Sequence, residues 1–320
     1  MGENGLHIAV TGAAGHLAGA LLRRLVEDER IASITAMDLR PVSMGDKVRY
    51  VQGDMADKQA VKEALAGADV VAHFAFIVLR PPGLSREQMR RINLGGARVV
   101  LEAAAEAGVR RLVVASSTAI YGAKHDSKIF LTEDTPSTPD VGFDYGEDKA
   151  ALEDLLDKFE ASHPEVVVTR FRPSTTGGPH MDPRRLADLA GKTVFLPSNP
   201  LPVFQFLHED DLGAAFHLAC VKDLPGPYNV SPDDAGMTVP EALASIGKRV
   251  ILVPPWVAKP VGWVLWKLGK SVLPPGWITI QDPVVSNARL KAAGWQPKYA
   301  SMETFYQTVE AMGIGKRPSA

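Results

Sequence analysis

Short apolar runs alternate with segments of helical periodicity through the first half of the chain. Predicted strands lie at 6–11, 33–39, 47–52, 69–76, 111–117 and 165–171. The runs 69–76 and 111–117 show almost no polar alternation, which is typical of strands buried on both faces of a parallel sheet. Predicted helices fill the intervals, at 17–26, 57–66, 85–107 and 145–162. This alternation predicts an α/β fold with a doubly wound parallel (Rossmann) sheet built from right-handed crossovers.

The pattern loosens after Pro173, and Gly177, Gly178 and Pro179 mark a break. Further elements are expected at 182–190 (helix), 202–207 (strand), 209–222 (helix), from 239 (helix), 249–253 (strand), 256–269 (helix) and 302–312 (helix). We therefore expect an NAD-binding Rossmann domain over 1–173 and a smaller C-terminal α+β substrate lobe over 174–320. Part of that lobe, about 202–222, is expected to return to the Rossmann domain.

Composition excludes several classes of protein. With 46% apolar and 22% charged residues, the chain of 320 residues is not wholly disordered. A net charge of −2 gives no overall basic field for nucleic acid or an anionic membrane. The single cysteine, Cys220, excludes an intramolecular disulfide and favours a cytoplasmic location. Neither a signal peptide nor a membrane span is expected, since charges and prolines interrupt the apolar C-terminal region.

A glycine-rich turn, TGAAGHLAG, follows the first strand and opens a helix. Gly12 allows the tight turn, Gly15 lets the backbone approach a pyrophosphate, and the small Ala18 permits close packing of helix on strand. His16 and Leu17 begin the helix, whose free N–H groups and positive dipole end attract phosphate. This position between a strand and a helix is the context that a dinucleotide site requires.

Asp38 ends the second predicted strand, 26 residues after Gly12. An acid here can accept hydrogen bonds from the ribose hydroxyls of NAD and repels the 2′-phosphate of NADP. We therefore predict NAD as the cofactor. Arg40 lies two residues further on and could assist a 2′-phosphate, so NADP is not excluded.

Tyr145 and Lys149 are four residues apart on a predicted helix, so they project from one face. A nearby ammonium favours the phenolate form of a tyrosine, which makes it a usable general acid or base near neutral pH. Ser116, Ser117 and Thr118 follow an apolar strand of the same sheet. Because ligands bind at the carboxyl ends of strands in such folds, these residues are the candidate catalytic group.

Histidines are weaker candidates. His73 lies inside an apolar strand and is interpreted as a buried core residue. His208 precedes the acids of Glu209–Asp211, which suit the N-terminus of a helix. The remaining histidines form no pair at ligand spacing, so no catalytic metal is expected.

Taken together, these motifs resemble an extended or atypical short-chain dehydrogenase/reductase of the NAD-dependent epimerase/dehydratase family. The resemblance covers nearly the whole chain, with anchors in TGAAGHLAG (11–19), Asp38, GDM (53–55), DVVAHFA (69–75), NLGG (93–96), SSTAIYG (116–122), Tyr145, Lys149, Arg172-Pro173 and FLHEDD (206–211).

The resemblance implies a role for each catalytic candidate. Tyr145 would be the general acid/base, and Lys149 would hold the nicotinamide ribose and favour the Tyr145 phenolate. Ser117 would donate a hydrogen bond to the substrate oxygen, and Thr118 could share that task. Tyr121 would be structural.

It also implies the rest of the cofactor site. Asp54 and Met55 would flank the adenine, and Phe74 and Ala75 would line the path of the ribose and diphosphate. Asn93 would support the helix beneath the active site. The predicted helices 85–107 and 145–162 would form a homodimer interface.

Departures from the family pattern limit the chemistry. Nucleotide-sugar dehydratases carry an Asp-Glu pair where this chain has Thr118 and Ala119, so 4,6-dehydration is not expected. Sugar epimerases carry an Asn at the place of Thr175 and an Arg at the place of Phe204. Without that cation a charge-assisted contact to a substrate diphosphate is lost. Arg80, Arg184 or Arg185 could replace it from another loop.

Trp256, Trp263 and Trp266 make the region after 255 unusually apolar, and Trp277 follows further on. Three interpretations stay open: the core of the smaller lobe, the wall of an apolar substrate pocket, and a peripheral membrane contact through an amphipathic helix carrying lysines.

The sequence therefore predicts an NAD-dependent oxidoreductase that transfers hydride at a secondary alcohol or ketone, with a small, possibly apolar substrate. An NAD-dependent nucleotide-sugar epimerase of the UDP-hexose type is the alternative. A non-catalytic NAD(P)-sensing Rossmann protein would not need Ser117, Tyr145 and Lys149, and nucleic acid is not an expected partner.

Overall fold

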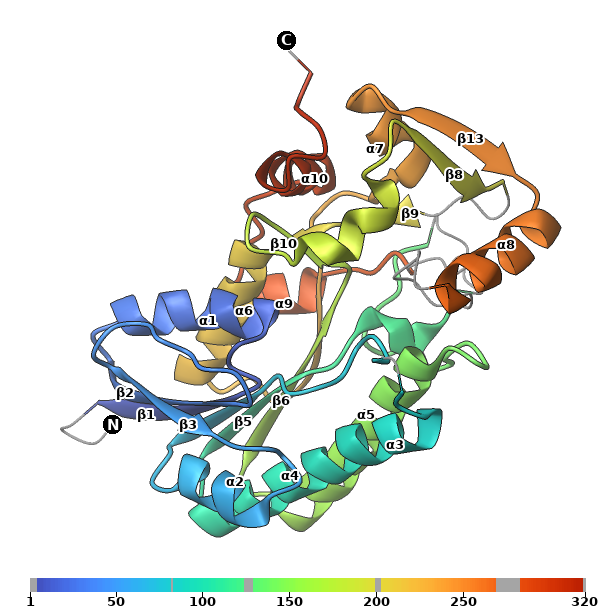
Figure 1. The fold of residues 1–320 in the computed structure, drawn as a ribbon. Coiled ribbons are helices and arrows are strands. Elements are labelled where there is room, and N and C mark those ends of the chain that lie inside the picture. The colour runs from blue at the N-terminus through green and yellow to red at the C-terminus, as the bar shows by residue number, and fades with distance from the viewer. Residues whose placement is uncertain (1–4, 82, 124–128, 199–202, 269–282, 319–320) are drawn as a thin grey trace.

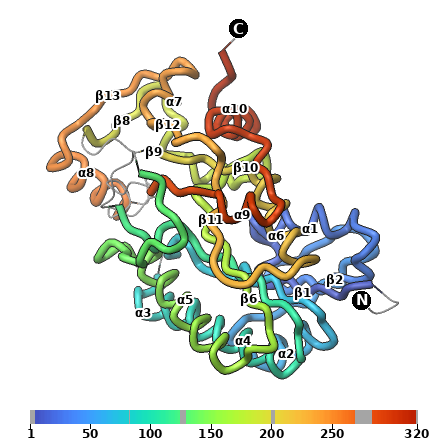
Figure 2. Tube along the Cα trace, turned by 180° about the vertical axis from the view of Figure 1, so that it is seen from behind, coloured from blue at the N-terminus to red at the C-terminus, as the bar shows by residue number. Residues whose placement is uncertain are grey.

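The computed structural model describes residues 5–318 except 82, 124–128, 199–202 and 269–282. It has a Rossmann part built on one large sheet and a smaller part that carries β8, β13, α7 and α10 (Figure 1). Seen from behind, the smaller part lies at one end of the molecule, and α2 and α4 lie at the other (Figure 2).

Seven parallel strands form the large sheet, in the order β11-β6-β5-β4-β1-β2-β3. They are β1 (Leu6–Thr11), β2 (Ile31–Asp38), β3 (Val48–Gln52), β4 (Val70–His73), β5 (Arg111–Ala115), β6 (Val167–Pro173) and β11 (Gly226–Val230). The predicted doubly wound parallel sheet is confirmed. The order reverses at β1, so the topological switch point lies between β1 and β4, where such folds bind ligands.

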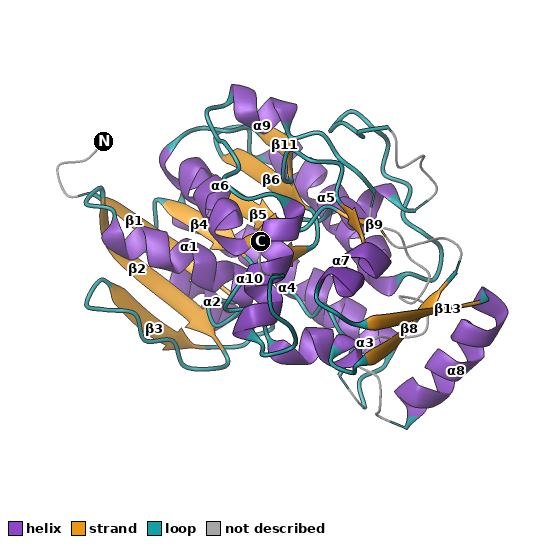
Figure 3. Ribbon diagram, turned by 90° about the horizontal axis from the view of Figure 1, so that it is seen from above, coloured by secondary structure: helices purple, strands orange, loops and turns teal. Residues whose placement is uncertain are grey.

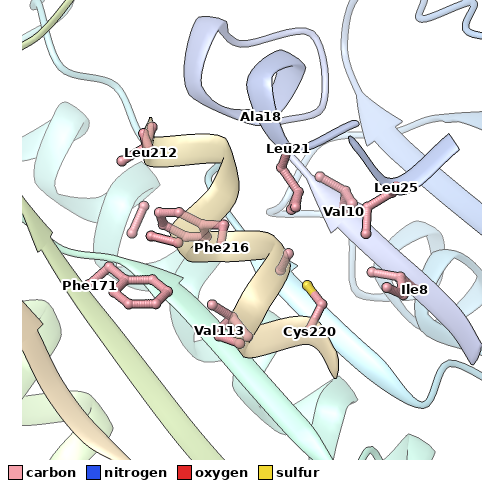
Figure 4. Packing of buried hydrophobic residues seen from close by; sticks show 14 of the residues in the cluster. Ile8, Val10, Ala18, Leu21, Leu25, Val113, Phe171, Leu212, Phe216 and Cys220 are labelled. Carbon is pink, nitrogen blue, oxygen red and sulfur yellow. The ribbon is translucent and has the colours of Figure 1, made fainter. Parts of the chain in front are cut away.

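Two helices, α1 (His16–Glu27) and α6 (Glu209–Val221), pack against each other over one face of the sheet. Figure 4 shows Leu21 of α1 and Phe216 of α6 in this layer, above sheet residues such as Val113. The opposite face is covered by α2 (Lys58–Leu65), α4 (Gly96–Ala107) and α5 (Asp144–Ser162), whose apolar residues form a second core with the sheet. Burial of apolar side chains on both faces explains why the central strands β4 and β5 are apolar along most of their length.

The helix predicted over 85–107 consists of three pieces. A short helix, α3 (Arg86–Arg90), passes into a π-helical turn, Arg91–Gly95, and then into α4. Such turns are rare and often lie at functional sites. Here the turn contains Asn93, which is fully buried beside the segment after β4.

Three two-stranded sheets build the smaller part: β7 (Thr176–Gly177) with β10 (Leu207–His208), β9 (Val203–Phe204) with β12 (Met237–Thr238), and β8 (Thr193–Pro197) with β13 (Arg249–Val253). Its helices are α7 (Val239–Ser245), α8 (Pro255–Lys267), α9 (Ala288–Ala292) and α10 (Ser301–Ala311). The helix expected over 182–190 is a 3₁₀ helix, Pro183–Leu189. Within the described residues, the strand expected over 202–207 is divided between β9 and β10.

Two elements that follow Pro173 in the sequence belong to the Rossmann part, one as a strand of the large sheet and one as a helix that covers it. The helix predicted over 209–222 is α6, which packs on α1, while β11 pairs with β6 at the edge of the sheet. The sequence analysis did not predict β11, because its residues GPYNV lack a continuous apolar run. The domain boundary at 173 stays a prediction.

No helix in the described part of the chain combines the length and the hydropathy needed to span a bilayer.

Candidate functional site

The turn after β1 is fixed against the segment that follows β4. Gly12 has a φ of +69°, which favours glycine, and a Cβ atom there would lie 2.5 Å from the backbone nitrogen of Ala75. Phe74 donates its N–H to the carbonyl of Thr11 at 3.0 Å. Gly12 therefore permits both the turn and the close approach of the two loops at the switch point.

The N-terminus of α1 fits an anion. Gly15 is its N-cap, no described side chain caps it, and its first turn carries no acid. His16 and Leu17 supply the first two helical N–H groups, which point out of the helix end. A pyrophosphate is the kind of group that such an exposed helix end binds. The predicted dinucleotide site is therefore compatible with the local structure.

His16 also belongs to a cluster that sequence reasoning missed. Its Nε2 contacts one carboxylate oxygen of Glu209, and Nδ1 of His180 contacts the other. Arg23 lies 3.3 Å from the same carboxylate. Burial raises the pKa of Glu209, but hydrogen bonds from the two histidines outweigh it and lower that pKa to about 2.

The three residues of this cluster are distant in sequence, so spacing gave no signal. Gly178 makes room for it, since a Cβ atom there would lie 2.5 Å from Cγ of Glu209. The cluster links the start of α1, the start of α6 and the loop after β7. Among the described residues, no group of three or more side chains is arranged to hold a metal ion.

Asp38 lies at the carboxyl end of β2, beside the glycine-rich turn. Its carboxylate accepts hydrogen bonds from the backbone N–H groups of Ala14, at 3.0 Å, and Arg40, at 2.9 Å. The Arg40 side chain donates to the carbonyl of Ala14 at 2.8 Å and remains largely exposed. Asp38 thus holds a negative charge next to the turn, with a cation within reach.

Other predicted cofactor residues lie at the same edge of the sheet. Asp54 and Met55 follow β3, and Met55 packs against Gly96 at the start of α4. Phe74 and Ala75 follow β4. The ring of Phe74 packs on Phe216 of α6, with 4.5 Å between centroids, so this side chain contributes to the core as well.

Tyr145 and Lys149 lie on the first turns of α5, as the four-residue spacing predicted. The Nζ of Lys149 is 5.8 Å from the Tyr145 ring centroid and donates to the carbonyl of Ala115 at 2.6 Å. Burial lowers the pKa of Lys149 to about 7, opposed by Glu153 and Asp148.

An aromatic residue that the sequence analysis did not single out completes this group. The Phe76 ring lies 3.7 Å from the Lys149 ammonium and meets Tyr145 edge-on, with 6.0 Å between centroids. Its position at the end of the run DVVAHFAF, beyond the last residue of β4, was the available signal.

Ser117 and Thr118 begin the turn that follows β5, a 3₁₀ helix over Thr118–Tyr121. The Ser117 hydroxyl accepts the N–H of Ala119 at 3.2 Å, whereas the Thr118 hydroxyl donates to the carbonyl of Pro173 at 3.3 Å. Gly146 lets α5 approach this turn, because a Cβ atom there would lie 2.9 Å from the carbonyl oxygen of Ala119.

A buried polar network lies beside these residues. Glu153 on α5 accepts hydrogen bonds from Ser116 at 2.5 Å and from Nε of Arg172 at 2.9 Å. Arg172 also donates to the Tyr121 hydroxyl at 2.8 Å, and that hydroxyl donates to Asn229 of β11. Burial raises the pKa of Tyr121 to about 12. These contacts support the interpretation of Tyr121 as structural.

Asn93 and His73 both have structural contacts. The Asn93 side chain bonds both the N–H and the carbonyl of Ile77, at 2.8 and 3.1 Å, and so fastens the loop after β4. His73 is buried, and its Nδ1 is 2.7 Å from the Thr11 hydroxyl. Burial and the nearby Lys149 lower the pKa of His73 to about 3, so its ring is neutral.

Two of the three arginines that could replace the missing substrate cation have other partners. Arg184 forms a salt bridge with Asp182, and Arg80 lies over the ring of Trp266, 5.7 Å from its centroid. Phe204 packs in the core of the smaller part, where the sequence pattern of sugar epimerases places an arginine.

Two of the three tryptophans of α8 are largely exposed, whereas the first of the three interpretations, a core segment, would bury them. Trp256 has 77% and Trp263 52% of its surface exposed. Trp277 lies outside the described residues.

Comparisons with known proteins agree with this fold. The model of the NAD dependent epimerase/dehydratase family matches residues 8–231. A dTDP-D-glucose 4,6-dehydratase of Mus musculus is 26% identical over 324 residues, which cover 95% of this chain and 87% of the relative. An uncharacterised protein of Mycobacterium tuberculosis is 25% identical over 325 residues, covering 96% of this chain and 84% of the relative.

Among solved structures, the UDP-glucose 4-epimerase of Thermus thermophilus in complex with NAD superposes with a TM-score of 0.77 at 23% identity. The match covers 96% of this chain and 99% of that one. It establishes a shared fold over nearly the whole chain.

Proposed function

Because the chain belongs to the NAD-dependent epimerase/dehydratase family, we propose that it is an NAD-dependent oxidoreductase that acts on a secondary alcohol or ketone. The family membership confirms the predictions of an enzyme and of NAD as its cofactor. The observation that carries the proposed chemistry is the packing of α5, which bears Tyr145 and Lys149, against the turn after β5, which begins at Ser117.

In the direction of oxidation, the Tyr145 phenolate accepts the proton of the substrate hydroxyl. The Ser117 hydroxyl donates a hydrogen bond to the same oxygen and fixes its position. Lys149, as an ammonium, favours the phenolate form of Tyr145 by its charge. NAD, when bound, supplies the nicotinamide that accepts hydride from the alcohol carbon.

The residues proposed to hold NAD surround the switch point. The N–H groups at the start of α1, with Gly12, Gly15, His16 and Leu17, would bind the pyrophosphate. Asp38 would bind the adenosine ribose, and Lys149 the nicotinamide ribose. Asp54, Met55, Phe74 and Ala75 would line the remaining cofactor surface.

The substrate is proposed to be less charged than a nucleotide sugar. Thr175 and Phe204 replace the residues that recognise a diphosphate, and Thr118 and Ala119 replace the Asp-Glu pair of dehydratases. We further propose a cytoplasmic homodimer that packs through α4 and α5.

Tyr145→Phe tests the catalytic assignment. We expect turnover to fall by roughly 10²–10⁴, the usual contribution of a positioned acid or base, with little change in NAD affinity. Turnover within a few-fold of wild type would refute the assignment. Activity assays with a panel of secondary alcohols measure turnover, and calorimetry with NAD measures cofactor affinity.

A nucleotide-sugar epimerase is the second candidate, favoured by the fold shared with UDP-glucose 4-epimerase. It would use the same residues twice, oxidising the alcohol and reducing the ketone from its other face. Mass spectrometry of the purified protein separates the candidates. Tightly retained NAD would favour the epimerase, and an exchangeable cofactor would favour the dehydrogenase.

A further inference from the structure

Helix α8 exposes apolar side chains on the face where a surface helix of a globular protein ordinarily carries polar residues. Trp256, Trp263 and Val264 are 77%, 52% and 47% exposed. They share one face with Pro260 and Lys267, at spacings of i, i+4, i+7, i+8 and i+11. The side toward the protein carries the buried Gly262 and the half-buried Ala258 and Trp266.

The exposed apolar surface extends along the helix and beside it. Val261, Leu265 and Leu268 continue it on α8, with exposures of 50%, 38% and 63%. Phe195 of β8 and Leu252 of β13 are 65% and 45% exposed. Viewed from above, α8 lies at the rim of the molecule, next to the β8–β13 ribbon (Figure 3). A surface with this many large apolar side chains marks an interaction site. We call it the α8 surface.

The charges in the chain segment that carries β13 and α8 all have one sign. Between Ala242 and Leu268 the chain carries Lys248, Arg249, Lys259 and Lys267, and no aspartate or glutamate. The Lys267 ammonium lies 5.5 Å from the Trp263 ring centroid, so cation and aromatic residue share one face. The segment is therefore locally basic, although the net charge of the chain is −2.

We propose that the α8 surface docks the protein on an anionic lipid surface. Tryptophan and leucine on a short helix, flanked by lysines, are the composition of helices that lie in the membrane interface. Lysines can lay their aliphatic stems along the apolar face and keep the ammonium among the headgroups. A protein partner or a second copy would have to offer acids and an apolar face together, whereas an anionic bilayer offers both at once.

Docking would also bring the active site close to the lipid. Arg80, in the loop after β4, lies over Trp266 of α8. Asn93 fastens the same loop at Ile77, next to Phe76 and Tyr145. The protein-facing side of α8 thus borders the loop that forms one side of the catalytic group, and the α8 surface lies on the opposite side of the same helix.

Vesicle flotation of the full chain tests the proposal. We expect wild type to float with phosphatidylcholine vesicles that contain phosphatidylglycerol and to float much less with phosphatidylcholine alone. Lys259→Gln/Lys267→Gln should lower the partition coefficient by roughly 30-fold, because each lysine near an anionic surface contributes a factor of about 5. Lys298→Gln/Lys316→Gln, with the same charge change at exposed sites elsewhere, should bind like wild type.

Trp256→Ser/Trp263→Ser tests the apolar part and should abolish flotation. Circular dichroism and NAD affinity must match wild type, and Lys259→Gln/Lys267→Gln keeps the test valid if this variant misfolds. Failure of wild type to float, or equal binding to neutral vesicles, would overturn the proposal. A second outcome would also overturn it: if sedimentation equilibrium without lipid shows that wild type self-associates and the tryptophan variant does not, a second copy covers the α8 surface.

Discussion

Lys149 is a buried cation whose protonation is coupled to folding. Burial lowers its pKa from the ordinary 10.5 to about 7. Above pH 7 the unfolded chain keeps a proton that the folded chain has lost, so this residue makes stability rise with pH up to about 10.

Lys149→Met should remove that contribution. Below pH 7 the folded wild type carries a buried charge that the variant lacks. As the pH rises from 7 to 9, the unfolding free energy of wild type should increase relative to that of the variant by up to about 1.4 kcal/mol per pH unit. Urea unfolding of both proteins at pH 6, 7, 8 and 9 measures the difference between their unfolding free energies. The contributions of the other titrating groups are the same in both proteins and cancel in this difference. A difference that does not change with pH would contradict a lowered Lys149 pKa.

Asp38 is expected to set the choice of cofactor. Its carboxylate, fixed by Ala14 and Arg40, would meet the 2′-phosphate of NADP as a like charge. We expect wild type to bind NADH more tightly than NADPH, and Asp38→Ala to reduce that preference at least about 10-fold, which is about 1.4 kcal/mol. Arg40→Ala is the matched control and should increase the preference. Fluorescence titration with both cofactors provides the constants, and a wild-type preference for NADPH would transfer the role to Arg40.

At the scale of elements, the contact between α5 and the turn after β5 depends on one glycine. In Gly146→Ala the new Cβ would meet the backbone oxygen of Ala119 at 2.9 Å. We expect a loss of about 1–3 kcal/mol in unfolding free energy, and lower turnover because Tyr145 is adjacent. Gly95→Ala, at a helical glycine with nothing within 4 Å of the added atom, should be neutral or stabilising. Equal effects on stability in the two variants would show that helix propensity, not the close contact, decides the outcome.

At the scale of the whole molecule, the fold gives two of the arginines that could bind a substrate diphosphate other partners. Arg184 is paired with Asp182, and Arg80 is stacked on Trp266. We expect UDP, UDP-glucose and UDP-galactose to bind with dissociation constants no better than about 0.1–1 mM, or about 4–5.5 kcal/mol. A buried diphosphate without a cation bears an uncompensated desolvation cost. Calorimetry on the NAD-loaded protein measures this, and micromolar binding would make the epimerase the leading candidate.

The sequence by itself determined the features that depend on local signals. Apolar runs and helical periodicity identified six strands of the large sheet and the helices that cover it. The glycines of the first turn indicated a dinucleotide fold, and the spacing of Tyr145 and Lys149 placed both residues on one helix, whose catalytic role stays a prediction. Each of these signals spans a few residues, over which backbone geometry fixes which side chains share a face.

Only the tertiary structure decided the features that join distant segments or depend on exposure. His16, His180 and Glu209 come together because α1, α6 and the loop after β7 pack at one point, and no spacing in the chain encodes that meeting. The strand β11 was invisible because pairing with β6, rather than its own composition, makes it a strand. The apolar pattern of α8 was visible in the sequence, but burial depends on what packs against a helix, and the fold leaves Trp256 and Trp263 exposed.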